Sequence, residues 1–379
     1  MGSFLNFVFL SDNLEKNGGD DFQQGPMFIY ITERNRYSYT LNGQLKEGYK
    51  NILMMEGVNT LESFLNLDNS ILEFIKTNDV KLLAVSLADP TIKEKYFNVL
   101  NYLNKKIGKD KYIVFDSNMR LSECFNIQYF LEEATWDKKT FFDSEKNDLN
   151  YFSEEIKQNE LDLFKNKKFI SFNRNIDKHH RASLFHEWIN NDYSDSYFSF
   201  INNIEYVNEI VGVGKIKDLN FYNSKLPIEL DTFETDNKFY FRTTNTFKKE
   251  LFLNSCINIV TETSCFFNEL FISEKILKPI LNYQPFIVLG PYQYLRELKK
   301  YGFKTFSEVW DESYDEIINP YERIPAVISL INNLNKKTIQ EFNEIYQKIK
   351  NICIYNRELF DSLELDSFPQ IFKKIENEW

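Results

Sequence analysis

The chain has 379 residues, of which 43% are hydrophobic and 27% charged, a balance typical of a soluble globular protein long enough for two domains. Its net charge of −11 argues against a surface built to bind nucleic acid, but it does not exclude a local basic pocket. The four cysteines are scattered without C-x-x-C spacing, which indicates free thiols in a reducing compartment. No stretch approaches the roughly eighteen apolar residues of a membrane span. The sequence therefore predicts a cytoplasmic protein with no transmembrane segment.

The N-terminal half alternates strand-like and helix-like segments. Short apolar runs predict strands at Leu5 to Leu10, Met27 to Ile31, Ile52 to Met55, Leu82 to Leu87 and Tyr112 to Phe115. Helical periodicity predicts helices at Leu61 to Thr77 and Ile92 to Leu103. Apolar strands separated by helices are typical of βαβ units around a parallel sheet.

A polar region separates this half from the next. Residues 137 to 167 are rich in Asp, Glu, Lys and Asn, and the segment from Asp148 to Phe164 is predicted to form a helix or helical linker. A domain boundary is therefore expected near residue 165.

The C-terminal half repeats the alternation. Strands are predicted at Lys168 to Phe172, Tyr197 to Ile201, Cys256 to Val260, Pro285 to Leu289 and Phe303 to Phe306. Helices are predicted at His179 to Ile189, Thr246 to Leu253, Gln293 to Tyr301 (ended by Gly302) and over most of 321 to 378. Together the halves predict an α/β protein with two Rossmann-like domains facing a central cleft. Ligands in such sheets bind beyond the carboxyl ends of the strands.

Basic residues follow the first predicted strand of the second half. Arg174 comes directly after it, and Lys178, His179, His180 and Arg181 open the next helix. Arginine and a helix N-terminus are well suited to hold a diphosphate. A solvated loop whose charges face water is the alternative interpretation. The three histidines have no carboxylate or thiolate partners at ligand spacing, so no metal site is expected.

Acidic residues follow the strand ending at Val260. Glu262 comes just after it, and Ser273 is the predicted N-cap of a helix that opens with Glu274 and Lys275. A carboxylate at a sheet rim can accept both hydroxyls of a ribose. The alternative interpretation is that Glu262 is an ordinary loop charge and that Glu274 is a first-turn acid stabilised by the helix dipole. No glycine-rich phosphate loop is present, which argues against P-loop enzymes and ordinary dehydrogenases.

These residues resemble a known family. The run from Ile259 to Ser264, followed by Phe271-Ile272-Ser273-Glu274-Lys275, is similar to the nucleotide-sugar signature of α1,3-fucosyltransferase-type glycosyltransferases. The stretch from Ser171 to Arg181 resembles the same family's upstream strand and basic loop. The continuation to Phe306 resembles related viral and bacterial glycosyltransferases. Thr263 stands where the family has Asn, which argues against fucose itself.

The resemblance implies a GT-B glycosyltransferase: residues 1–165 form an acceptor-side domain, 166–345 a nucleotide-sugar-binding domain, and 346–379 a helical tail packing back toward the first domain. It implies that Arg174 and Lys275 contact the diphosphate, with Lys178, Arg181 and Lys278 as further candidates. Glu274 would bind the ribose, and Glu262 would lie near the transferred sugar. Neither a metal nor another cofactor is expected.

The expected reaction is an inverting transfer from a nucleoside-diphosphate sugar, with a GDP-sugar favoured, to a hydroxyl of a glycan or glycolipid. An acceptor linked to lipid would bring the protein to a membrane surface. The base that removes the acceptor proton is expected among carboxylates at predicted strand ends. Asp116 and Asp89 occupy such positions, although an ordinary turn or cap residue is the commoner role of an aspartate there.

Three alternatives stay open. The donor could be of another class, as in rhamnosyl-, xylosyl- or Kdo-type transferases. The chain could instead bind a nucleotide or glycan without catalysis on the same scaffold. An epimerase-like enzyme is disfavoured by the missing glycine-rich loop. Donor competition and turnover assays separate these.

Overall fold

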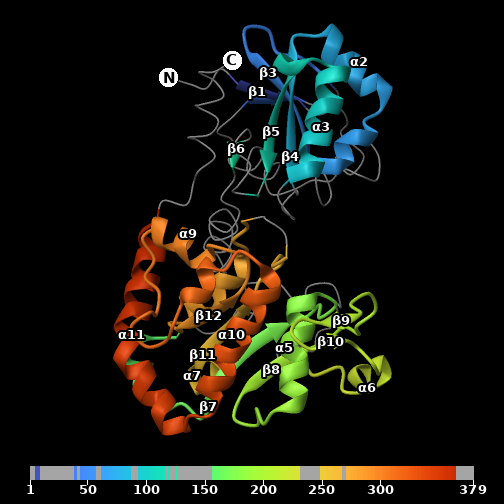
Figure 1. The fold of residues 1–379 in the computed structure, drawn as a ribbon. Helices are drawn as coiled ribbons and strands as arrows, with labels where there is room; N and C mark the ends of the chain where they lie inside the picture. Colours follow the sequence, from blue (N-terminus) through green and yellow to red (C-terminus); the bar gives the residue numbers. More distant parts are fainter. Residues whose placement is uncertain are drawn as a thin grey trace, which may run out of the picture. The chain divides into compact units, whose positions relative to one another are not determined.

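The computed structural model describes residues 5–8, 38–40, 43–56, 61–86, 93–116, 118, 125–126, 156–230, 248–266 and 270–363. The chain divides into two compact units (Figure 1). The first holds the described residues up to 126 together with 270–271, and the second holds the remainder from 156 onward. The predicted strand at Met27 to Ile31 lies outside the described residues.

The first unit is built on a parallel sheet. Within the described residues its strand order is β2-β1-β3-β4-β5-β6, and every neighbouring pair is parallel. The strands are β1 (Leu5–Val8), β2 (Ser38–Thr40), β3 (Lys50–Glu56), β4 (Val80–Ser86), β5 (Tyr112–Asp116) and β6 (Phe125–Asn126). The predicted strands that begin at Leu5, Ile52, Leu82 and Tyr112 thus become parallel strands, whereas β2 and β6 were not predicted.

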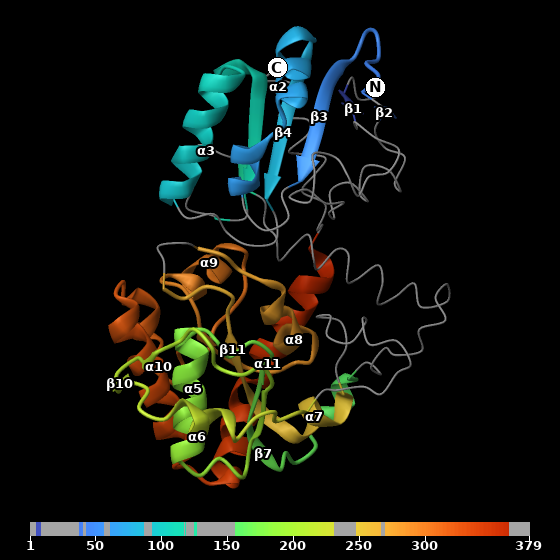
Figure 2. The ribbon, with the colours of Figure 1, turned by 90° about the vertical axis from the view of Figure 1, so that its right-hand side faces the viewer.

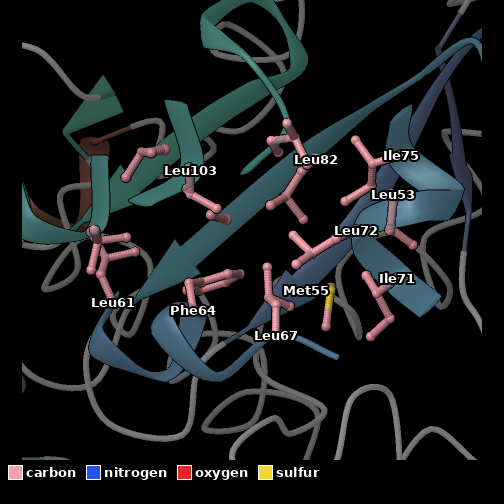
Figure 3. Packing of buried hydrophobic residues seen from close by; sticks show 14 of the residues in the cluster. Leu53, Met55, Leu61, Phe64, Leu67, Ile71, Leu72, Ile75, Leu82 and Leu103 are labelled. Atoms are coloured by element: carbon pink, nitrogen blue, oxygen red, sulfur yellow. The ribbon is translucent and has the colours of Figure 1, made fainter. Parts of the chain in front are cut away.

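Helical segments cover this sheet with an apolar layer. They are η2 (Leu61–Asn66), α2 (Asn69–Thr77) and α3 (Lys93–Lys106). The short 3₁₀ turn η3 (Lys109–Lys111) precedes β5 and buries no side chain. Figure 3 shows Phe64, Leu72 and Leu103 packing against Leu53 and Leu82 of the strands. Burial of each such side chain contributes about 1.5–3 kcal/mol to folding.

The predicted helix from Leu61 to Thr77 is wrong as one element, because the chain forms η2 and then α2. The break comes at Asp68, which caps α2 by accepting a bond from the Ser70 N–H at 2.7 Å. A residue that caps a helix has non-helical dihedrals, so the two segments cannot form one continuous helix. Periodicity alone did not reveal this stop.

The second unit has its own parallel sheet. In its described residues the order is β12-β11-β7-β8, again with parallel neighbours. These strands are β7 (Lys167–Asn173), β8 (Tyr197–Phe200), β11 (Ser255–Thr261) and β12 (Phe286–Leu289). A small antiparallel hairpin, β9 (Glu209–Ile210) and β10 (Gly214–Lys215), lies outside this sheet.

Helices cover both faces of the second sheet. On one face lie α5 (His179–Asn190) and α10 (Pro320–Asn335), and on the other α7 (Lys249–Asn254), α8 (Leu277–Leu281) and α11 (Ile339–Ser362), as Figure 2 shows. The remaining elements are η4 (Gln158–Glu160), α6 (Leu219–Asn223), η5 (Glu274–Ile276), α9 (Tyr294–Lys300) and η6 (Ser313–Glu316). This three-layer arrangement explains why β11 and β12 are buried along their whole length.

Two further predicted elements are wrong. Residues Phe303 to Phe306 form no strand, because side chains satisfy the main chain there: the Phe306 N–H donates to Glu312 Oε1 at 2.7 Å. In the described part of the predicted helix at Asp148 to Phe164, only the turn η4 is helical. By contrast Gly302 adopts φ 90° and ends α9 as predicted.

The parallel sheets confirm the predicted α/β class with two Rossmann-like halves. A central cleft between the halves stays a prediction, as do the domain limits, although the predicted limit at 345 falls inside α11. Of the helices described, none combines the length and apolar character needed to cross a bilayer.

Candidate functional site

The carboxyl edge of the second sheet is held together by buried polar side chains. Ser171 Oγ on β7 donates to the Ile259 carbonyl of β11 at 2.8 Å. Thr261 Oγ1 donates to Asn173 Oδ1 at 2.7 Å, joining the last residues of the same two strands. Because all strands are parallel, the loops that follow them emerge at this one edge. It is the place where the sequence predicts a ligand site.

Arg181 lies in the first turn of α5 and points into this edge. Its side chain is buried, and Nη1 donates to the Asn175 carbonyl at 2.9 Å. Nη2 donates to the carbonyls of Thr261 and Glu262, each at 3.0 Å. Arg181, predicted as a phosphate ligand, thus binds main-chain carbonyls of two loops.

His180 reaches the same main-chain segment. Its Nε2 lies 2.8 Å from the Glu262 carbonyl, so Nε2 carries the proton and donates. Burial lowers the pKa of His180 well below its usual value, and the neighbouring charge of Arg181 adds to this effect. The imidazole is therefore neutral at physiological pH.

Glu262 is fully buried where β11 ends. Its carboxylate accepts from the Tyr294 hydroxyl at 2.5 Å, the Thr263 N–H at 3.1 Å and the Ser273 N–H at 3.3 Å. Gly290 makes room for it, since a Cβ there would lie 3.2 Å from Glu262 Cγ. In this arrangement Glu262 binds the main chain at both Thr263 and Ser273.

Arg323, on α10, joins the loops after β11 and β12. It is buried, and its Nε donates to the Gly290 carbonyl at 3.0 Å, while Nη2 donates to the Cys265 carbonyl at 2.6 Å. Nη1 donates to the carbonyls of Ile317 and Ile318. Sequence reasoning missed Arg323 and Tyr294. No local sequence pattern marks either residue, because Arg323 is a charged residue within a helix and Tyr294 occupies an ordinary core-facing position of a helix.

Two half-buried lysines meet at Thr263. Lys178 Nζ donates to the Thr263 carbonyl at 2.7 Å, and Lys275 Nζ donates to Thr263 Oγ1 at 3.0 Å and to Ser273 Oγ at 3.3 Å. Arg174 is exposed at the end of β7, and its guanidinium makes no hydrogen bond or ion pair within the part of the chain that the structure describes. The fold thus brings together Lys178 and Lys275, two residues from different loops that were predicted to bind the sugar donor.

Ser273 caps the next turn as predicted, because its Oγ accepts from the Lys275 N–H at 3.3 Å. The turn begins as η5 and continues as α8. The side chain of Glu274, the predicted ribose ligand, lies outside the described residues. Lys278 places Nζ 4.7 Å from the centre of the Phe172 ring, a cation–π contact.

The two aspartates predicted to act as the general base, Asp116 and Asp89, belong to the first unit. Asp116 is fully buried at the end of β5, and its Oδ1 accepts from the Asn118 N–H at 2.7 Å. Asp89 lies outside the described residues.

The described side chains bring no three His, Cys, Asp or Glu groups together in an arrangement that could bind a metal ion. Beside the site, burial raises the pKa of Cys265 to about 11. That thiol is therefore protonated at neutral pH and is a poor metal ligand or nucleophile.

Comparison with known proteins gives one match. No family model and no curated protein matches the sequence. Among solved structures the chain is similar to a crystal structure of an α1,3-fucosyltransferase at 11% identity and a TM-score of 0.43, covering 98% of this chain and 89% of that one. At this level of similarity, a function for this chain has to be argued from its own residues.

Proposed function

We propose that this protein is a glycosyltransferase that moves a sugar from a nucleoside-diphosphate donor to a hydroxyl of a glycan or glycolipid, with inversion and without a metal. The observation that carries the proposal is the convergence of the Lys178 and Lys275 ammonium groups on Thr263, at the carboxyl end of β11. Two positive charges fixed at one point of a sheet edge suit a diphosphate. Arg174 adds a third charge at the end of the neighbouring strand.

The proposed chemistry needs such charges. The acceptor oxygen attacks the anomeric carbon, the bond from that carbon to the phosphate oxygen breaks, and the electron pair leaves with the diphosphate. Cations that are already positioned stabilise the charge developing on this leaving group. Arg181, His180 and Glu262 contribute indirectly, because they fix the main chain next to Thr263, the residue to which both lysines donate.

The acceptor proton needs a base. We assign this step to a carboxylate of the first unit, Asp116 or Asp89, and keep Glu262 as the carboxylate nearest the transferred sugar. A GDP-sugar is the favoured donor, and the ribose is assigned to Glu274.

A nucleotide panel tests the proposal. Melting temperatures of the full chain are measured with GDP, UDP, CMP, TDP and ADP, since a ligand that binds only the folded state raises the melting temperature. We expect a shift with one nucleotide, and Lys275→Met should weaken its binding by about tenfold, because it removes a charged hydrogen-bond donor. Lys336→Met is the matched control, an exposed lysine bonded to Asn333 at the end of α10.

The outcomes are distinct. A shift with UDP or CMP in place of GDP would assign another donor class. Binding with neither hydrolysis nor transfer of the matching sugar nucleotide would indicate a non-catalytic binding protein. No shift with any nucleotide, or equal losses in both variants, would contradict the proposed site.

A further inference from the structure

Arg323 joins three loops of the second unit from the interior. It is 2% exposed, and its guanidinium donates to four main-chain carbonyls. Those of Cys265 and Gly290 follow β11 and β12, and those of Ile317 and Ile318 precede α10. The planar guanidinium, with its donors in a fixed fork, is suited to bridging several carbonyls at once.

A second buried arginine shows what is particular about Arg323. Arg357 on α11 also binds the main chain, because its Nη1 donates to the Leu281 carbonyl at 2.7 Å, before β12 begins. Its Nε lies 2.8 Å from Asp361 Oδ2, so a carboxylate offsets its charge. Arg323 makes no ion pair in the part of the chain that the structure describes. A buried charge that is offset only by carbonyl dipoles adds to the positive potential at the carboxyl edge of the sheet.

Arg323 fixes the main chain on the far side of Thr263. Before Thr263, the chain is held by Arg181, which donates to the Glu262 carbonyl at 3.0 Å. Two residues after Thr263, the Cys265 carbonyl accepts from Arg323 Nη2 at 2.6 Å. Two peptide units span at most about 7 Å. Thr263, to which both lysines of the proposed diphosphate site donate, is therefore held between two buried guanidinium groups.

The same arginine fixes the residue against which Glu262 packs. Arg323 Nε donates to the Gly290 carbonyl at 3.0 Å, and Cys265 Sγ donates to the same oxygen at 3.1 Å. Gly290 in turn contacts Glu262, since a Cβ at this glycine would lie 3.2 Å from Glu262 Cγ. Arg323 thus links the loop that carries Thr263 to the backbone beside the buried carboxylate.

We propose that Arg323 is a positioning residue of the diphosphate site, which sets the place of Thr263 and thereby the spacing of the Lys178 and Lys275 ammonium groups. This inference rests on the proposed function. A diphosphate has to meet both ammonium groups at once, so it binds most tightly when their common anchor is held in place before binding. Without Arg323, ordering the loop becomes part of the cost of binding.

Calorimetric titration of the full chain with inorganic pyrophosphate tests this role. Arg323→Ala loses both the fork and the charge, and we expect it to weaken pyrophosphate binding by about tenfold. Arg323→Lys keeps the charge and loses the fork, so we expect a smaller loss of about threefold. If Arg323→Ala does not fold, Arg323→Lys decides the question by itself.

Arg357→Ala is the matched control, because it also removes a buried guanidinium that binds a main-chain carbonyl. It should destabilise the fold, as denaturant titration measures, and leave pyrophosphate affinity unchanged. Unchanged affinity in Arg323→Lys, or equal losses in Arg323→Ala and Arg357→Ala, would overturn the positioning role and leave the diphosphate site standing. If the unaltered protein binds neither pyrophosphate nor any nucleotide, the proposed function fails and this inference fails with it.

Discussion

Two groups of basic side chains at the edge of the second sheet differ in burial. His180, Arg181 and Arg323 are buried and bind main-chain carbonyls. Arg174, Lys178 and Lys275 are exposed or half-buried, and Lys178 and Lys275 lie together at Thr263. Members of both groups come from one run of eight residues, 174 to 181. Neighbouring basic side chains of this run are therefore either buried against the main chain or left exposed or half-buried, according to which way the start of α5 turns them.

The largest expected effect comes from Arg181→Met. It leaves the carbonyls of Asn175 and Thr261 without the guanidinium, and the loss of a donor to the buried Thr261 carbonyl is costly. We expect the free energy of unfolding to fall by about 3 kcal/mol or more, measured by denaturant titration. Arg174→Met, at an exposed position in the same run, should change it by less than about 0.5 kcal/mol. Similar losses in both variants would remove the distinction between the two groups.

A medium effect is expected from Tyr294→Phe. The change removes one hydroxyl that donates to the buried Glu262 carboxylate and keeps the ring. A hydrogen bond to a charged group is worth about 1.5–3 kcal/mol, so the free energy of unfolding should fall by about 2 kcal/mol. Tyr355→Phe is the control, since its hydroxyl bonds the Gly302 carbonyl near the surface. If Tyr294→Phe were as stable as this control, Glu262 would not depend on that bond.

The smallest expected effect is a dependence of stability on pH that arises from the buried His180. His180 stays neutral in the fold because burial lowers its pKa, whereas in the unfolded chain it titrates near its ordinary value of 6.5. As pH falls below about 6.5, the unfolded state binds a proton that the folded state does not, so stability decreases. His180→Gln keeps an N–H donor and cannot titrate. Relative to this variant, the free energy of unfolding of the unaltered protein should fall by about 1 kcal/mol between pH 7 and pH 5.5.

Denaturant titrations of both proteins at the two pH values measure this difference. Carboxylates common to both proteins cancel in the comparison. Parallel stability curves would mean that His180 titrates in the folded state as it does in the unfolded chain.

Most strands and several caps could be predicted from the sequence because their causes are local. A continuous apolar run such as that of β4 or β11 has to be buried on both faces, which a parallel sheet provides. Ser273 and Gly302 act on their own turns, so their roles follow from neighbouring residues. Where another local signal was overlooked, as at Asp68, the predicted helix was wrong.

The site was predictable only in outline. Placing Arg174, Lys178, Glu262 and Lys275 after strands followed from the alternation of apolar runs. Which charges are buried did not follow, because it depends on partners far along the chain: Arg181 binds Thr261, Tyr294 binds Glu262, and Arg323 binds Gly290.

The sequence by itself determined the α/β alternation and the strand ends that carry charged residues, since both arise from hydrophobic periodicity and capping within a few residues. Only the tertiary structure decided that Lys178 and Lys275 meet at Thr263 and that Arg323 joins Cys265 to Gly290. Those contacts require the strand order β12-β11-β7-β8 and the packing of α5 and α10, which bring together segments that no local pattern connects.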